Sequence, residues 1–260
     1  MKWQEIPEQQ KKKLWQFAEE LAAIGAETSL QYFGKDIGIE WKADESPVTQ
    51  ADRETEQAMR DRISEEHPLH AIHGEEFGTD THAEYTWVLD PIDGTKSFIN
   101  GVPLYCCLVA LLYQGEPVVG VIYNPPSGEL VSGCIGLGAH DETGNAVHMG
   151  DTGRLLRIST SDFADLMSAL STTPQPWLSR LLQPPVIART WGDGYGYLLA
   201  ATGRCDIMID PVLELWDVAP VYPIIHEAGG VLCDINGHQS QLPGSAVVLS
   251  QQLYQKLFTD

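Results

Sequence analysis

Two aspartates three positions apart carry the clearest chemical signal in the sequence. Asp90 and Asp93 follow a short apolar run at residues 87–89, and Gly94 closes the turn that contains them. The run predicts a buried strand, and Thr95 with the apolar residues behind it predicts a helix start. Carboxylates at a strand end, beside the free N–H groups of a helix start, can hold a divalent cation next to a phosphate. An ordinary surface turn is the competing interpretation, because Asp, Pro and Gly are common turn residues.

Acids at the ends of other predicted elements favour a site over a surface turn. Such acids follow a short strand predicted at residues 71–74, lie in the first turn of a helix predicted near residue 51, and open another helix predicted at 215–228. Together with the first pair they are Asp52, Glu75, Glu76, Asp90, Asp93 and Asp217. Hard cations such as Mg²⁺ prefer oxygen ligands, and ions that share carboxylates can polarise a phosphate and activate a water. For Asp52 alone, a helix acid that suits the macrodipole is the alternative.

The composition limits the partners of the protein. The 260 residues, 43% hydrophobic and 20% charged, are enough for a globular unit with a large core. The formal net charge of −20 argues against nucleic acid or an anionic membrane as a partner. A phosphate substrate would also be repelled, unless bound cations reverse the field locally.

The cysteines and the apolar runs indicate a soluble protein in the cytoplasm. The cysteines are Cys106, Cys107, Cys134, Cys205 and Cys233, and no two of them form a C-x-x-C pair. Scattered thiols with apolar neighbours fit small core residues in a reducing compartment. No secretory signal is visible near the N-terminus, and the longest apolar run, residues 102–113, is too short to span a bilayer.

The pattern of elements changes near the middle of the chain. The first part predicts helices at 7–33 and from 51 to Pro68, strands at 104–112, 118–123 and 129–132 that form a meander, and a further hairpin within 136–153. The second part predicts strands at 168–172, 186–190, 205–209, 231–234 and 246–249, with helices at 194–203, 215–228 and 251–258. We therefore expect one catalytic unit over residues 1–260, with an α+β half (1–153) that carries most metal ligands and a more α/β half (154–260). Pro223 should kink the helix at 215–228 or delay its start.

Five segments, in order, resemble the signatures of the inositol monophosphatase superfamily. They are Pro-Val-Thr-Gln-Ala-Asp at 47–52, Gly-Glu-Glu at 74–76, Asp-Pro-Ile-Asp-Gly-Thr at 90–95, Gly-Arg-Cys-Asp at 203–206 and Trp-Asp-Val-Ala at 216–219. The resemblance covers almost the whole chain. It implies a layered α-β-α-β-α sandwich of the inositol monophosphatase and fructose-1,6-bisphosphatase type. It also implies Mg²⁺-dependent hydrolysis of a small phosphomonoester, usually by a homodimer.

The resemblance assigns the acids to two or three Mg²⁺ ions. Glu75, Asp90 and the Ile92 carbonyl would hold the first ion. Asp90, Asp93 and Asp217 would hold the second. A third, weaker ion would use Glu75 and waters.

The resemblance also assigns the water and the phosphate. Thr95, hydrogen-bonded to Asp52, would orient or deprotonate the attacking water, with Glu75 nearby. The backbone N–H groups of Gly94 and Thr95 would receive the phosphate. Glu76 would have a supporting role. The implied chemistry is in-line attack by a metal-activated water without a phosphoenzyme.

The substrate signal lies in residues 189–198. In inositol-directed relatives the corresponding segment carries small residues, whereas this chain has Arg189, Trp191, Asp193 and two tyrosines. With the continuation at 96–103, it resembles the histidinol-phosphatase branch of the superfamily. Histidinol phosphate carries an amine and an imidazole, so Asp193 and Glu214 could pair with cationic groups, and Trp191 or a tyrosine could cover the imidazole. Packing on a helix face is the alternative for Trp191.

The prediction is therefore a histidinol-phosphatase that releases L-histidinol and phosphate, a step of histidine biosynthesis. The first alternative keeps the chemistry and changes the substrate to inositol 1-phosphate, a nucleotide 3′-phosphate or a sugar phosphate. The second alternative is a non-catalytic protein whose acids bind a cation. The expected pairing of Thr95 with Asp52 favours an enzyme, since cation binding alone would not need it.

Overall fold

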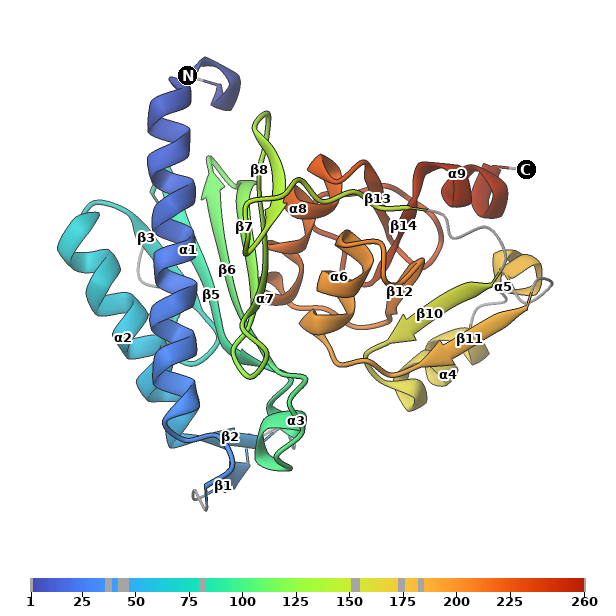
Figure 1. Cartoon of the computed structure of the whole chain (residues 1–260), viewed down its shortest axis with the longest axis horizontal. Coiled ribbons are helices and arrows are strands. Elements are labelled where there is room, and N and C mark those ends of the chain that lie inside the picture. The colour runs from blue at the N-terminus through green and yellow to red at the C-terminus, as the bar shows by residue number, and fades with distance from the viewer. Residues whose placement is uncertain are drawn as a thin grey trace.

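The computed structural model describes residues 2–35, 39–41, 47–79, 83–150, 155–172, 176–181 and 185–259. These residues form five layers in which helices and sheets alternate (Figure 1). Residues before 142 supply the larger sheet, and residues after 155 supply the smaller one. The predicted α-β-α-β-α sandwich is confirmed.

The larger sheet has seven strands in the order β4-β3-β5-β6-β7-β8-β9. They are β3 (Ala71–Gly74), β4 (Gly78–Thr79), β5 (Tyr85–Asp93), β6 (Cys106–Tyr113), β7 (Glu116–Asn124), β8 (Glu129–Cys134) and β9 (Gly138–Asp141). Neighbours run antiparallel except β3 and β5, which run parallel with Gly74 opposite Leu89. Parallel strands end at the same edge, so the acids that follow β3 lie beside the end of β5. The predicted meander is confirmed, and β9 extends it.

Both faces of the larger sheet are covered, which explains its long apolar strands. On one face, Trp87, Leu89 and Leu111 pack in one cluster with helix α1 (Glu8–Leu30) and with Met59 of helix α2 (Gln50–Glu66). On the other face, Leu108 packs in a second cluster with helices α6 (Gly194–Ala201) and α8 (Val221–Glu227). Figure 1 shows α6 and α8 between the two sheets.

The smaller sheet has five strands in the order β11-β10-β12-β14-β13. They are β10 (Leu156–Thr160), β11 (Val186–Arg189), β12 (Ile207–Asp210), β13 (Gly230–Cys233) and β14 (Ala246–Ser250). Strand β10 runs parallel to both β11 and β12, with Thr160 opposite Ile209. This register brings the residues after β10 next to Asp210 at the end of β12.

The remaining elements complete the layers. They are helices α3 (Thr95–Ile99), α4 (Phe163–Thr172), α5 (Pro176–Leu181), α7 (Leu215–Val218) and α9 (Gln251–Tyr254), a π-helical turn (Gln255–Thr259), the 3₁₀ turn Trp3–Glu5 and the hairpin of β1 (Ile39–Trp41) and β2 (Pro47–Thr49). Leu166, Trp177 and Leu253 of α4, α5 and α9 pack on the outer face of the smaller sheet. The fifth layer is thus built from short helices. Residues 42–46 of the loop predicted before Asp52 lie outside the described residues.

Two sequence predictions about secondary structure are wrong. Residues 168–172 were predicted as a strand but belong to helix α4, whose apolar residues Phe163, Leu166 and Met167 follow a helical spacing that begins before that window. The continuous helix at 215–228 is instead two helices. The break falls at Pro220, which caps α8, and Pro223 lies in the first turn of α8, where a missing N–H costs little. The expected disruption by prolines is therefore present.

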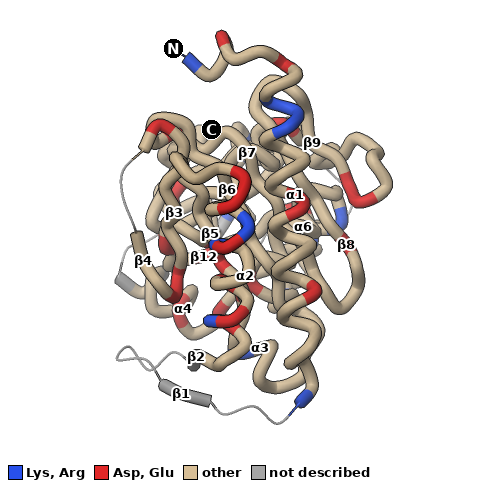
Figure 2. Tube along the Cα trace, turned by 90° about the vertical axis from the view of Figure 1, so that its left-hand side faces the viewer, with Lys and Arg blue, Asp and Glu red and all other residues tan. Residues whose placement is uncertain are grey.

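Charge is spread over the surface. In the view onto α1 and α2, acidic positions outnumber basic ones and lie on many elements (Figure 2). Within the described ranges, no helix combines the length and the apolar character needed to cross a membrane.

Candidate active site

A cavity of about 340 Å³ lies where elements from both sheets meet. The residues that line it are Glu75, Asp90, Ile92, Asp93, Gly94, Thr95, Lys96, Ser161, Asp162, Asp165, Asp193, Asp210, Val212, Glu214, Trp216 and Asp217. They come from the ends of β3, β5, β10 and β12 and from the starts of α3, α4, α6 and α7. A larger cavity of about 520 Å³, between α8 and β13, has no carboxylate among the residues that line it. The acidic cavity is therefore the candidate active site.

Three carboxylates in the cavity are close enough to share one cation. Asp90, Asp93 and Asp217 each offer one oxygen, and these oxygens lie within 4.8 Å of one another. Residues three apart on a regular strand face opposite sides of the sheet. Here three steps along β5, from Asp90 to Asp93, match two steps along β6, so β5 carries a bulge at this point. The bulge lets both carboxylates face the cavity.

Local hydrogen bonds hold these carboxylates. The backbone N–H of Ile92 donates to Asp90 Oδ1 at 3.1 Å. The backbone N–H of Glu214 donates to Asp217 Oδ2 at 2.7 Å, which forms half of a capping box at the start of α7. Asp90 and Asp217 are therefore held by residues near them in the sequence, whereas the hydrogen bond to Asp93 comes from the distant Gly194.

The electrostatics of the cluster fit a divalent cation. Burial, reinforced by neighbouring carboxylates, raises the pKa values of Asp90 and Asp93 well above the ordinary range. Burial also raises the pKa of Asp217 to about 7, and Glu75 and Asp193 add to the effect. Buried carboxylates without a counter-charge are costly. A hard cation with oxygen ligands would remove that cost, so the donor set fits Mg²⁺ or a similar ion.

The turn into α3 has the geometry of an anion site. Gly94 has φ +82°, and a Cβ atom there would lie 2.8 Å from Asp193 Oδ2, so only glycine fits this position. Gly94 and Thr95 line the cavity next to the acids. The first N–H groups of a helix have no intrahelical partner and are suited to a phosphate oxygen.

The expected hydrogen bond between Thr95 and Asp52 is not formed, so that prediction is wrong for this structure. The Thr95 hydroxyl donates to the Ile92 carbonyl at 3.1 Å. Asp52 Oδ2 accepts from the backbone N–H and the hydroxyl of Thr49 at 2.7 and 2.6 Å, because the two residues form the capping box of α2. Asp52 Oδ1 is buried without a hydrogen-bond partner. Burial raises the pKa of Asp52 to about 6, with smaller contributions from Glu76 and Glu75.

The four predicted substrate residues divide into two pairs. Asp193 and Glu214 line the cavity. Arg189 and Trp191 are not among the described residues that line it. Arg189 is exposed on edge strand β11. Trp191 packs against the central core, but it lies before the start of α6, so it packs there without being on the helix face that the alternative named. Burial raises the pKa of Asp193 to about 6, and Lys96 opposes the rise.

Several cavity residues were missed by the sequence analysis. They are Lys96, Ser161, Asp162, Asp165, Asp210, Val212 and Trp216. Asp210 ends β12, so the rule applied to the other acids would have found it. The Ser161 hydroxyl donates to Asp210 Oδ1 at 2.8 Å, while burial raises the pKa of Asp210 to about 7. Lys96 Nζ lies 3.7 Å from Asp162 Oδ2 across the cavity mouth.

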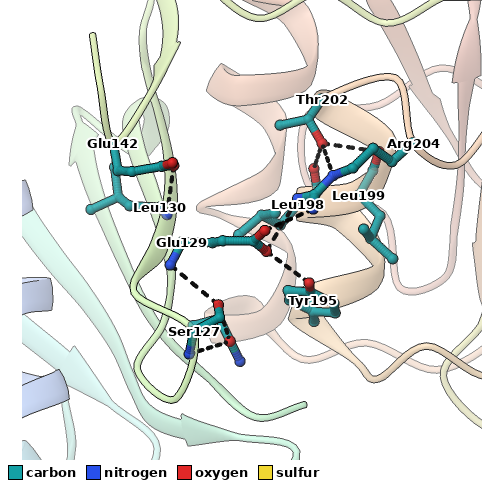
Figure 3. A network of polar contacts seen from close by, with 10 residues as sticks. Ser127, Glu129, Leu130, Glu142, Tyr195, Leu198, Leu199, Thr202 and Arg204 are labelled. Atoms are coloured by element: carbon teal, nitrogen blue, oxygen red, sulfur yellow. Dashed lines mark hydrogen bonds and ion pairs between the residues drawn. The ribbon is translucent and has the colours of Figure 1, made fainter. Parts of the chain in front are cut away.

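Helix α6 connects the site to the larger sheet at two points. At its start, the Gly194 N–H donates to Asp93 Oδ2 at 2.5 Å. Farther along, Glu129 of β8 accepts from the Tyr195 hydroxyl at 2.7 Å and from two nitrogens of Arg204 at 2.8 and 3.2 Å (Figure 3). We call Glu129, Tyr195 and Arg204 the α6 clamp. The clamp and the Gly194 contact together fix the place of Asp193 at the helix start.

Comparisons with known proteins identify the family to which the chain belongs. Residues 10–259 match the model of the inositol monophosphatase family, and the chain belongs to this family. It is therefore a phosphoric monoester hydrolase that acts on a small phosphomonoester, and members of the family depend on metal.

Individual relatives refine the comparison. The chain is 38% identical to the histidinol-phosphatase of Chlorobaculum parvum over 237 residues, which is 90% of each chain. It is 35% identical to the histidinol-phosphatase of Mycobacterium tuberculosis, over 89% of this chain and 91% of the relative. Among solved structures, an inositol monophosphatase from Zymomonas mobilis is 28% identical with a TM-score of 0.78, over 95% of this chain and 97% of that chain. The resemblance stated from the sequence motifs is confirmed.

Proposed function

We propose that the protein is a Mg²⁺-dependent histidinol-phosphatase, which hydrolyses L-histidinol phosphate to L-histidinol and phosphate. The observation that carries the proposal is a second set of acids in the same cavity. Asp193, Asp210 and Glu214 line it together with the three clustered aspartates. A substrate with an amine and an imidazole gains from such acids, whereas a polyol phosphate does not. Two relatives named histidinol-phosphatase, at 38% and 35% identity, support the same substrate.

In this proposal the clustered acids hold two to three Mg²⁺ ions. Asp90, Asp93 and Asp217, with Glu75 and the Ile92 carbonyl, are the ligands. Bound Mg²⁺ would neutralise phosphate charge and lower the pKa of a water. The N–H groups of Gly94 and Thr95 orient the phosphate, a role that the helix start and the left-handed Gly94 support.

In this proposal, side-chain oxygens of the protein orient the attacking water. The Thr95 hydroxyl lies at the cavity and is bonded to a backbone carbonyl, so it can exchange that bond for another. Asp52 is not among the described residues that line the cavity, but its Oδ1 is buried without a hydrogen-bond partner. We infer that Oδ1 accepts a hydrogen bond from the Thr95 hydroxyl when substrate is bound, so that the hydroxyl oxygen can accept one from the water. Glu75 lies in the same cavity and can orient the same water.

The imidazole has a better partner than Trp191. Trp216 is the one aromatic side chain among the described residues that line the cavity, and it stacks on His73 with ring centroids 5.7 Å apart. An aromatic face held in this way attracts a cationic or neutral imidazole. We therefore propose Trp216 for the imidazole and Asp193 or Glu214 for the amine.

The test is phosphate release by the purified protein with Mg²⁺, from histidinol phosphate and from inositol 1-phosphate in parallel. We expect kcat/KM to be about 100-fold higher for histidinol phosphate, which corresponds to about 2.7 kcal/mol of transition-state preference. Equal or reversed values of kcat/KM would mean that the substrate is a small phosphomonoester other than histidinol phosphate. Release from neither substrate, nor from nucleotide or sugar phosphates, would favour a protein that only binds cations.

We further propose that the enzyme is a cytoplasmic homodimer. All five cysteines are free and buried, which supports a reducing compartment. The dimer rests on the family resemblance alone. Light scattering coupled to gel filtration measures the mass directly, and a mass near 28.7 kDa would mean a monomer.

A further inference from the structure

Glu56 is a fully buried carboxylate that does not line the cavity, yet it contacts the turn that carries Glu75. We call Glu75, Glu76 and Phe77 the β3–β4 turn. The backbone N–H of Glu76 donates to Glu56 Oε2 at 2.7 Å, and that of Phe77 donates to Glu56 Oε1 at 3.3 Å. Hydrogen bonds from backbone N–H groups to a buried carboxylate are strong and directional. Glu56 therefore holds the turn by its main chain.

Arg60 completes this support from the next turn of α2. Its Nε lies 2.7 Å from Glu56 Oε1, and its side chain donates to the Gly78 carbonyl at 2.6 Å. Glu56 and Arg60 are both buried, so neither charge is screened by solvent. The pair thus binds the N–H groups of the β3–β4 turn and the carbonyl of Gly78, the first residue after it.

Gly74 allows this contact. A Cβ atom at Gly74 would lie 1.9 Å from Glu56 Oε1 and 2.7 Å from Oε2. The backbone of Gly74 is not in the left-handed region, so the need for glycine here is one of space. The carboxylate of Glu56 therefore rests directly against the strand end that precedes Glu75.

The turn is fixed on its other side by the strand that bears the aspartates. The backbone N–H of Glu75 donates to the Leu89 carbonyl of β5 at 3.2 Å. Leu89 directly precedes Asp90 in β5. Glu75 therefore lies between this end of β5 and helix α2. Asp52 lies one helical turn before Glu56, on the same side of α2. One face of α2 therefore carries both Asp52, which is proposed to act on the attacking water, and Glu56, which binds the turn that bears Glu75.

We propose that Glu56 is a positioning residue that sets the carboxylate of Glu75 toward the metal ligands, with Gly74 and Arg60 as its partners. The proposal rests on the proposed function, in which Glu75 is a ligand. Without Glu56 the β3–β4 turn loses two hydrogen bonds, and Glu75 is then held from the β5 side without the support of α2. Cation binding should weaken even where the fold survives.

The experiment is a calorimetric titration of the full chain with Mn²⁺, for Gly74→Ala, Glu56→Ala and the double variant. Gly74→Ala should weaken Mn²⁺ binding about tenfold or more, because the added methyl pushes the turn away from Glu56. Glu56→Ala should weaken it at least as much. In the Glu56→Ala background, Gly74→Ala should have no further effect, since the space is then empty. The matched control is Arg62→Gln, which breaks an ion pair of the same helix with Glu20 and should leave Mn²⁺ affinity unchanged.

A merely structural role for Glu56 gives a different pattern. Melting temperatures would fall, while the folded variants would bind Mn²⁺ as tightly as the parent protein, and this result would overturn the inference. Strictly additive losses would overturn it too, because they would separate Gly74 from Glu56. If Glu56→Ala does not fold, unchanged binding by Gly74→Ala alone is sufficient to reject it. If the parent protein binds no Mn²⁺, the proposed function fails first, and the inference fails with it.

Discussion

Asp193 is close to the clustered aspartates but belongs to the start of α6, so it could contact either a cation or the substrate. Its Oδ2 lies 2.8 Å from the position that a Cβ atom on residue 94 would take, so it faces the turn that is proposed to bind phosphate. The positive charge of Lys96 lowers the pKa of Asp193 and so opposes the effect of burial. A substrate amine would supply a second positive charge at the same place.

We therefore expect Asp193→Ala to raise KM for histidinol phosphate about tenfold or more. The KM for a neutral polyol phosphate should change much less, because that substrate has no cationic group to lose. Steady-state phosphate release with both substrates measures the split between KM and kcat. Equal increases for both substrates would count against the contact with the amine.

Asp210 gives a prediction about pH. Burial raises its pKa from 3.8 to about 7, despite the hydrogen bond from Ser161. The folded state therefore holds this proton more tightly than the unfolded chain does. Its contribution to stability is complete below about pH 4 and is lost as the pH rises toward 7, by at most about 4 kcal/mol.

Urea unfolding in EDTA at pH 5 and pH 8 measures this loss. The parent protein should be less stable at pH 8, and Asp210→Asn should reduce the difference between the two pH values. Part of the difference will remain, because the pKa of Asp217 is also raised by burial. Identical pH dependence in the two proteins would contradict the assignment.

At the scale of elements, α6 brings its first residues against Asp93, one of the proposed metal ligands of the larger sheet. A Cβ atom at Gly194 would lie 2.7 Å from Asp93 Oδ2 and 3.0 Å from Leu108. Gly196 of the same helix also has no room for a Cβ atom. The obstacle there is the end of the Met208 side chain. A methionine can change rotamer, whereas a carboxylate in a cluster cannot move freely.

Gly194→Ala should therefore lower kcat by about 100-fold or more with the fold retained. Gly196→Ala is the matched control on the same helix and should keep most of the activity. Phosphate release and the melting temperature, measured for both variants, separate the effect on Asp93 from a general loss of packing. Similar losses of activity in both variants would show that α6 acts only through packing.

The elements also show what the sequence could predict and what it could not. Periodicity was sufficient for α1, α2 and the strands of the meander, because both faces of that sheet are buried and the apolar runs are long. It failed at residues 168–172, because a window of five residues was too short to reveal the period of α4, which begins at Phe163. It also missed β10 and α5, which are short and lie beside polar segments.

The site residues were predictable where an acidic residue falls at the end of a predicted strand or at the start of a predicted helix. Acids at the ends of predicted strands and at a predicted helix start led to Glu75, Asp90, Asp93 and Asp217, which the structure brings into one cavity. Side-chain hydrogen bonds were not predictable, since the capping box of α2 takes the Asp52 oxygen that was expected to bond Thr95. Which residue faces a cavity also depends on tertiary packing, and so Trp191 and Trp216 could not be told apart from sequence.

At the scale of the whole molecule, the stability of the protein should depend on divalent cations. Asp90, Asp93 and Asp217 repel one another while they are ionised, and a bound ion would remove that repulsion. Mg²⁺ at about 100 times its dissociation constant should add about 2.7 kcal/mol to the free energy of unfolding. EDTA should reverse the effect.

Thermal unfolding with and without Mg²⁺ checks this expectation. Asp90→Asn is the informative variant, since it removes a ligand and also one buried charge. It should melt at a higher temperature than the parent protein in EDTA, gain little from Mg²⁺, and have no measurable turnover. Full activity in Asp90→Asn would remove the metal mechanism altogether.

The meeting of β5 and α7 at one site has a topological consequence. Asp90 and Asp217 are about 130 positions apart in the chain, and they belong to halves whose sheets share no strand. An ion held by both would act as a reversible cross-link that closes a very long loop. A covalent bridge across a loop of that length would restrict the unfolded chain by about 4 to 5 kcal/mol. The cation concentration would then set not only the rate of hydrolysis but also how firmly the two halves of the molecule stay joined.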